Sequence, residues 1–191
     1  MDDSSNIRVV IRVRPLSDSE RAKGEEIPWN ISEDSITQVM QYEGRQSLGQ
    51  MFTFGMGLIP FIHHFVDRVF DMQVTETRHV FDALSRGIIE GAIEGVHGTI
   101  FAYGQTSAGK TFTMQGPSSN PGIIPLGLEY FFQKMSEYSE TRKFSVKISY
   151  MEIYNEVIGD LLCKGNNNLK IHENLTKGIF VSDLTEVAVS E

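Results

Sequence analysis

The segment GTIFAYGQTSAGKTFTMQG, residues 98–116, constrains this chain more than any other part of its sequence. An apolar run stops at a glycine, crosses four small or polar residues and reaches Gly-Lys-Thr. Residues 104–111 therefore fit the pattern G-x-x-x-x-G-K-[ST] at every constrained position. The apolar run predicts a strand over residues 99–103, and a helix is predicted to open at Lys110. That order of strand, loop and helix is the context a phosphate-binding loop requires.

The residue types in this loop suit a bound nucleoside triphosphate. The two glycines permit backbone angles and close approaches that let successive N–H groups point at phosphate oxygens. The lysine would reach the β and γ phosphates, the threonine hydroxyl would bind magnesium, and the start of the helix adds a positive dipole end. A glycine-rich turn with a surface lysine is the alternative. The predicted nucleotide-binding residues are Gly104, Gln105, Thr106, Ser107, Ala108, Gly109, Lys110 and Thr111, and Thr111 is also the predicted metal ligand.

Composition favours one globular domain and argues against some classes of binding partner. The chain has 191 residues, of which 40% are hydrophobic, enough for one buried core. Its net charge of -8 argues against nucleic acid and anionic membranes as partners. The single cysteine, Cys163, excludes an internal disulfide and is typical of a reducing compartment. Because no window reaches roughly 18 apolar residues and no signal peptide pattern begins the chain, we expect a soluble cytoplasmic protein.

Strands alternate with helices along the chain, which predicts a layered α/β fold. A helix is predicted over residues 75–96, with Thr75 as its cap and Gly95 near its end. Residues 144–153 alternate like a strand and are followed by a predicted short helix toward Leu162. The other predicted elements are a strand at 6–16, a short helical tendency at 17–27, an antiparallel ribbon around Glu43 and Gly44, a helix at 123–140, and short strands within 169–174 and 178–190.

The segment GMGLIPFIHHFV, residues 55–66, does not fit this order. It is almost wholly apolar, contains a proline and matches neither the helical nor the strand period. It is too short for a membrane anchor, and His63 and His64 lack further ligands at the spacing of a zinc site. We interpret it as an irregular or inserted piece.

Several motifs in the same order resemble the motor head of the kinesins. The segment at 98–116 closely resembles the kinesin phosphate-binding loop. The resemblance extends from residue 6 to residue 191, interrupted at 55–66, with residues 1–5 expected to form a disordered tail. The segments LKIHEN and GIFVSDLTE are most similar to centromere-associated kinesins and their plant relatives. The other matching segments are IRVVIRVRPL at 7–16, DRVFD at 67–71, PGIIP at 121–125 and SYMEIYNEVIGDLL at 149–162.

This resemblance implies a P-loop NTPase head in which helices flank a central sheet. It implies ATP and Mg²⁺ as cofactors, microtubules as the partner, a place on the cytoskeleton, and hydrolysis coupled to movement. Arg12, Arg14 and Pro15 stand where the family contacts adenine, and a guanidinium plane or a proline ring can flank a flat base. Their alternative is the solvent-facing edge of a strand. Phe81 stands where the family usually has a tyrosine near the base, with packing in the helix core as an equal alternative.

The resemblance stops short of hydrolysis. The family positions water and senses the γ phosphate with Ser-Ser-Arg-Ser-His and Asp-Leu-Ala-Gly-Ser-Glu elements, and neither occurs in this sequence. SDLTE at 182–186 offers an Asp-Leu pair but lacks the necessary glycine. No catalytic residue is therefore assigned. A nonmotor protein that binds nucleotide or a partner without ATP turnover is the alternative function.

The head is expected to be incomplete at its C-terminal end, with uncovered sheet edges and most of the microtubule-binding surface missing. An incomplete or mis-spliced gene would produce both this feature and the inserted segment. An unrelated P-loop kinase or GTPase is disfavoured because the flanking segments match kinesin. Direction of movement, cargo and oligomeric state are not encoded in these residues.

Overall fold

The computed structural model describes residues 7–32, 35–42, 45–53, 67–71, 76–176 and 178–189. The chain divides into two compact units, Met1–Lys134 and Met135–Glu191. The phosphate-binding loop belongs to the first unit. The predicted tail at 1–5 and the segment at 55–66 lie outside the described residues.

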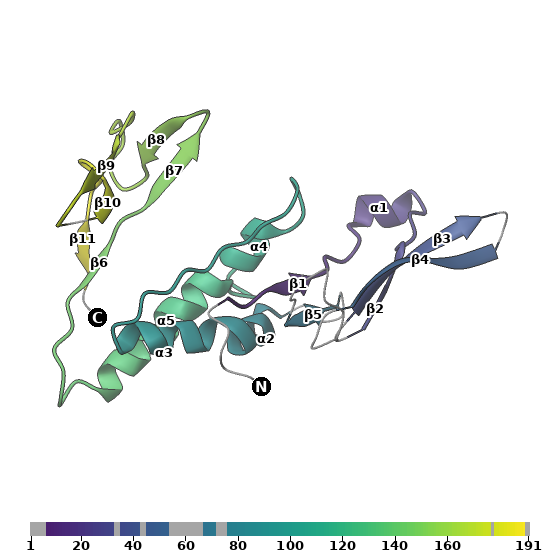
Figure 1. Ribbon diagram of the computed structural model, residues 1–191, viewed down its shortest axis with the longest axis horizontal. Helices are drawn as coiled ribbons and strands as arrows, with labels where there is room; N and C mark the ends of the chain where they lie inside the picture. The colour runs from purple at the N-terminus through teal and green to yellow at the C-terminus, as the bar shows by residue number, and fades with distance from the viewer. Residues whose placement is uncertain are drawn as a thin grey trace. The chain divides into compact units, whose positions relative to one another are not determined.

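Among the described residues, the first unit contains five strands of three to nine residues and a series of helices (Figure 1). Its strands are β1 (Val10–Arg12), β2 (Trp29–Ile31), β3 (Ser35–Tyr42), β4 (Arg45–Thr53) and β5 (Arg68–Phe70). Its helices are α1 (Asp18–Ala22), α2 (Thr77–Val80), the π-helical turn η1 (Phe81–Ser85), α3 (Arg86–Ile93), α4 (Lys110–Met114) and α5 (Ile123–Glu137), which runs past the boundary between the units.

Strand β1 forms the one parallel pairing in the described part of the chain. It pairs with β5, placing Ile11 opposite Val69, and the Val13 N–H continues the ladder by donating to the Phe70 carbonyl at 2.8 Å. The strand predicted at 6–16 is therefore confirmed in its centre but is shorter than expected. Proline at position 15 has no N–H to donate, which favours an early end.

The antiparallel ribbon predicted around Glu43 and Gly44 is confirmed. Strands β3 and β4 pair antiparallel, with Tyr42 opposite Arg45, and β2 pairs with the other edge of β3. The two turn residues themselves lie outside the described residues.

The main core of the first unit lies between helices and β5. Figure 1 shows α2, α3 and α5 close together, and Val80, Phe81 and Tyr130 are buried in the same cluster. The helix predicted at 75–96 is confirmed as α2, η1 and α3, although Glu76 is its N-cap and Thr75 lies outside the described residues. Gly95, with φ of 89°, follows its end as expected. No helix in the described ranges is long and apolar enough to cross a bilayer.

The strand predicted at 99–103 is wrong for the described structure. These residues enter no sheet, and Phe101 and Tyr103 are 81% and 97% exposed. A strand exists only where a neighbouring strand accepts and donates its backbone hydrogen bonds. Apolar residues in sequence cannot supply that neighbour.

The second unit contains three antiparallel strand pairs in the described residues. They are β6 (Val146–Ile148) with β11 (Val187–Val189), β7 (Met151–Tyr154) with β8 (Val157–Asp160), and β9 (Ile171–Asn174) with β10 (Gly178–Val181).

The short helix predicted toward Leu162 is wrong, because this stretch forms the β7–β8 hairpin. Asn155 and Glu156, at φ of 46° and 64°, make the turn between the strands. Two successive left-handed residues match the twist of a two-residue hairpin turn, and asparagine tolerates that conformation better than most side chains.

Candidate functional site

The phosphate-binding loop adopts a left-handed bend immediately before α4. Gly109 is the N-cap of α4 with φ of 96°, and Ser107 also has a positive φ of 65°. The Ala108 N–H donates to the Gln105 carbonyl at 3.2 Å, which closes the tip of the loop. A Cβ placed on Gly109 would meet no atom within 4 Å, so the space beside it is open. The conformation, rather than crowding, requires glycine there.

The side chain of Lys110 folds back along the loop. Its Nζ atom donates to the carbonyl oxygens of Gly104 and Gln105, at 2.8 Å each. The helix predicted to open at Lys110 is confirmed as α4. Thr111, the predicted metal ligand, is the second residue of α4 and is exposed. The charged amine and the hydroxyl thus come from the first turn of one helix.

A pocket of about 300 Å³ lies beside the loop, between the segment that follows β1 and the start of α4. It brings together the three residues predicted to contact a base, Arg12, Arg14 and Pro15, and two loop residues, Ala108 and Gly109. The other six predicted loop residues lie outside its lining. The remaining lining residues are Val13, Leu16, Ser17, Phe112 and Thr113.

Arg12 connects β1 to two helices at the inner end of this pocket. Its Nη1 atom donates to the Thr77 hydroxyl at 3.0 Å and to the Thr113 hydroxyl at 3.1 Å. The guanidinium lies 5.1 Å from the centre of the Phe112 ring, within cation–π distance. Partial burial lowers the pKa of Arg12. Arg12 is therefore an anchored part of the pocket and does not project from a solvent-facing strand edge.

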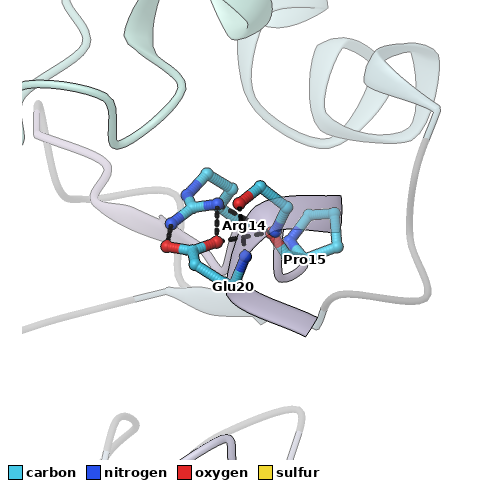
Figure 2. Close-up of polar contacts among 4 residues, drawn as sticks. Arg14, Pro15 and Glu20 are labelled. Atoms are coloured by element: carbon cyan, nitrogen blue, oxygen red, sulfur yellow. Dashed lines mark hydrogen bonds and ion pairs between the residues drawn. The ribbon is translucent and has the colours of Figure 1, made fainter. Parts of the chain in front are cut away.

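Arg14 is held by an acidic side chain from α1. Figure 2 shows its guanidinium facing the Glu20 carboxylate, with Nη2 to Oε1 at 2.6 Å and Nη1 to Oε2 at 2.8 Å. The same Nη1 atom donates to the Pro15 carbonyl at 3.0 Å. The hydrogen bond from Arg14, followed by those from Ser17, holds the pKa of Glu20 well below its usual range. The hydrogen bond to Glu20 raises the pKa of Arg14.

Phe112 is a pocket residue that the sequence pattern did not predict. It is 43% exposed, lines the pocket and follows Lys110 by two positions. The available signal is an aromatic residue between two threonines directly after the loop. Its ring is the only aromatic surface in the lining of this pocket.

Phe81 takes the second of its two predicted roles. It is 1% exposed, belongs to the main core and makes an edge contact with Tyr130 at 6.0 Å between ring centres. It does not line the pocket beside the loop. SDLTE likewise has a local use: the Asp183 carbonyl accepts from Asn166 Nδ2 at 2.9 Å, and the Thr185 N–H donates to Asp160 at 2.9 Å.

Comparison with known proteins matches the whole described site to one family. The kinesin motor domain family matches residues 12–191. The chain is 40% identical to the kinesin-like protein KIN-7D of Oryza sativa over 96% of its own length and 16% of that protein. It is 39% identical to human centromere-associated protein E over 99% of its own length and 6% of that protein.

A solved structure of a fast kinesin gives the same result for the fold. It superposes with a TM-score of 0.81 at 34% identity, covering 97% of this chain and 49% of the solved chain. The chain thus spans about half of a solved kinesin and a small part of its curated relatives. Both the sequence match and the shared α/β P-loop fold place the chain in the kinesin motor domain family.

Proposed function

We propose that this chain supplies the ATP-binding part of a microtubule motor, with Mg²⁺ as the metal. The observation that carries the proposal is the pocket that joins Arg12, Arg14 and Pro15 to the phosphate-binding loop. A pocket for a base beside a loop for phosphates is the arrangement a nucleotide requires. Two sequence segments about 90 residues apart meet there only because the chain folds.

The loop fits a triphosphate chemically. Open space lies beside Gly109, and the Lys110 ammonium is held within the loop by two carbonyl oxygens. Phosphate oxygens are stronger acceptors for an ammonium than neutral carbonyls, because both partners are then charged. The exposed Thr111 hydroxyl would hold Mg²⁺, which neutralises charge on the β and γ phosphates when bound.

The pocket fits a flat base. Phe112 offers an aromatic face, Pro15 offers a ring of fixed shape, and the two arginines offer guanidinium planes. In proteins that bind single-stranded nucleic acids, base–aromatic stacking contributes about 1–3 kcal/mol per base. The volume of about 300 Å³ is at the lower end of the range for small-molecule sites, which suits a base rather than a whole nucleotide.

Hydrolysis and movement along microtubules are proposed for the whole protein on family grounds. The second candidate is nucleotide binding without turnover by these 191 residues. It is favoured by the sequence, which contains neither of the kinesin elements that position water and sense the γ phosphate.

Thermal unfolding with and without MgATP tests the binding proposal. Ligand that binds only the folded state raises the unfolding temperature by mass action. We expect an increase with MgATP, and no increase in the parent chain would refute binding. Phosphate release measured with and without microtubules separates the two candidates. We expect little release from residues 1–191, and strong stimulation by microtubules would favour turnover over simple binding.

A further inference from the structure

We propose that Glu20 is a positioning residue for the base-binding side of the pocket, acting through Arg14. This inference rests on the proposed nucleotide-binding function and deepens it. Glu20 does not line the pocket, so any effect on a bound base must pass through residues that do.

One carboxylate joins two residues of the pocket wall. Oε1 accepts from Arg14 Nη2, while Oε2 accepts from Arg14 Nη1 at 2.8 Å and from the Ser17 N–H at 2.6 Å. Arg14 and Ser17 both line the pocket. Figure 2 shows this group of contacts around Arg14 and Pro15. Loss of the carboxylate would release both residues together.

Core packing does not explain the position of helix α1 beside Arg14. It buries none of its residues, so it contributes nothing to a hydrophobic core. It does carry a complete capping box, in which Ser17 Oγ accepts from the Glu20 N–H at 3.3 Å and Glu20 reaches back to Ser17. The capping box fixes the Glu20 side chain, and the fixed carboxylate holds the guanidinium.

The bidentate contact matters because Arg14 is a long, flexible side chain. Two parallel hydrogen bonds fix the plane of a guanidinium as well as its position. A side chain ordered before the ligand arrives loses less entropy on binding. The hydrogen bonds from Arg14 and Ser17 lower the pKa of Glu20, so its carboxylate, which is charged at neutral pH in any case, keeps this contact into the acidic range. The effect should therefore concern the base and leave the phosphates unaffected.

Isothermal titration of the 191-residue chain with MgATP and with magnesium tripolyphosphate separates these contributions. Tripolyphosphate carries the phosphates without a base. We expect Glu20→Gln to weaken MgATP binding roughly two- to fivefold, the range of partly exposed ion pairs, and to leave tripolyphosphate binding unchanged. Glu25→Gln is the matched control, because Glu25 attracts Arg14 as a nearby charge but contributes less to its raised pKa than Glu20 does.

Three results would overturn the inference. Equal loss for both ligands would mean that Glu20 supports the fold in general. An unchanged affinity of Glu20→Gln for MgATP would show that Glu20 does not act on the base, while binding by the parent chain would keep the proposed function intact. Binding of neither ligand by the parent chain would refute both proposals. In an Arg14→Ala background, Glu20→Gln should have a much smaller further effect, since only its contact with the Ser17 N–H then remains.

Discussion

The Nζ atom of Lys110 lies 2.8 Å from the carbonyl oxygen of Gly104, six residues earlier in the chain. Gly104 is the first and Lys110 the seventh position of the eight-residue phosphate-binding pattern, so the contact joins the start of the loop to the first residue of α4. The ammonium has three N–H donors, of which two are directed at the Gly104 and Gln105 carbonyls, so we expect a bound phosphate to accept from the third or to displace one of these carbonyls. The Lys110 ammonium therefore lies against the loop in the absence of any phosphate.

Replacing Lys110 with alanine tests whether this ammonium holds the phosphates. We expect Lys110→Ala to abolish the rise in unfolding temperature caused by MgATP, because the ammonium is the main positive charge in the loop. Without nucleotide the variant should unfold within a few degrees of the parent, since its lost bonds are to partly exposed carbonyls. Lys143→Ala, at an exposed lysine in the second unit, is the control. A normal MgATP shift in Lys110→Ala would contradict the assignment.

Truncation of the ring at position 112 tests the base-binding side. We expect Phe112→Ala to weaken MgATP binding roughly tenfold, from the loss of stacking, and to spare tripolyphosphate. Phe112→Tyr keeps the ring and should bind nearly as well as the parent. Calorimetry with both ligands provides the measurement. Equal MgATP affinity in Phe112→Ala and the parent would show that the ring does not contact the base.

The sequence predicted those parts of the site that local rules determine. The pattern at 104–111 located the loop and the start of α4, because glycine and lysine at that spacing have few other uses. Helices α3 and α5 followed from the 3.6-residue period of their apolar residues. The resemblance to kinesins supplied Arg12, Arg14 and Pro15, which the structure gathers in one pocket.

The features that the sequence did not predict depend on residues distant in the chain, or on the backbone conformation of a few turn residues. Residues 99–103 have a strand-like composition but no neighbouring strand in the described residues. The stretch predicted as a short helix toward Leu162 forms a hairpin, because Asn155 and Glu156 adopt left-handed conformations and make the turn between β7 and β8. Glu20 resembles an ordinary surface residue in sequence, and only the fold shows that its carboxylate contacts Arg14.

Glycine substitutions distinguish crowded from open backbone positions in the first unit. A Cβ on Gly116, which has φ of 64°, would lie 2.3 Å from the Asn120 carbonyl oxygen. We expect Gly116→Ala to lower the free energy of unfolding by about 2 kcal/mol or more, from backbone strain and this clash. Gly87 lies within α3, where an added Cβ would meet nothing within 4 Å, so Gly87→Ala should raise the free energy of unfolding by about 0.5–1 kcal/mol. Urea denaturation measures both, and equal effects would contradict this interpretation.

The carboxylate of Asp160 organises the loop that follows β8, and its protonation should loosen the second unit. Oδ1 accepts from the Leu162 N–H at 2.8 Å and the Cys163 N–H at 3.2 Å, and Oδ2 accepts from the Thr185 N–H at 2.9 Å. Hydrogen bonds from Thr185 are the largest cause of the lowered pKa of Asp160. A lowered pKa in the folded state means that the charged carboxylate stabilises the unit above the unfolded value of about 4. That stability is lost as the pH falls from about 4 through the lowered pKa.

Asp160→Asn should remove this contribution at neutral pH, because its amide nitrogen cannot accept from backbone N–H groups. We expect faster hydrogen exchange at the amides of Leu162 and Thr185 in the variant at pH 7, after correction for intrinsic rates. The difference from the parent should shrink progressively as the pH falls from about 4 toward the lowered pKa, because the opened state of the parent takes up a proton first and the folded state only at lower pH. Asp183→Asn is the control, since Asp183 is exposed in a left-handed turn that asparagine tolerates. A difference between parent and Asp160→Asn that is the same at every pH would show that the charge of Asp160 does not stabilise the loop.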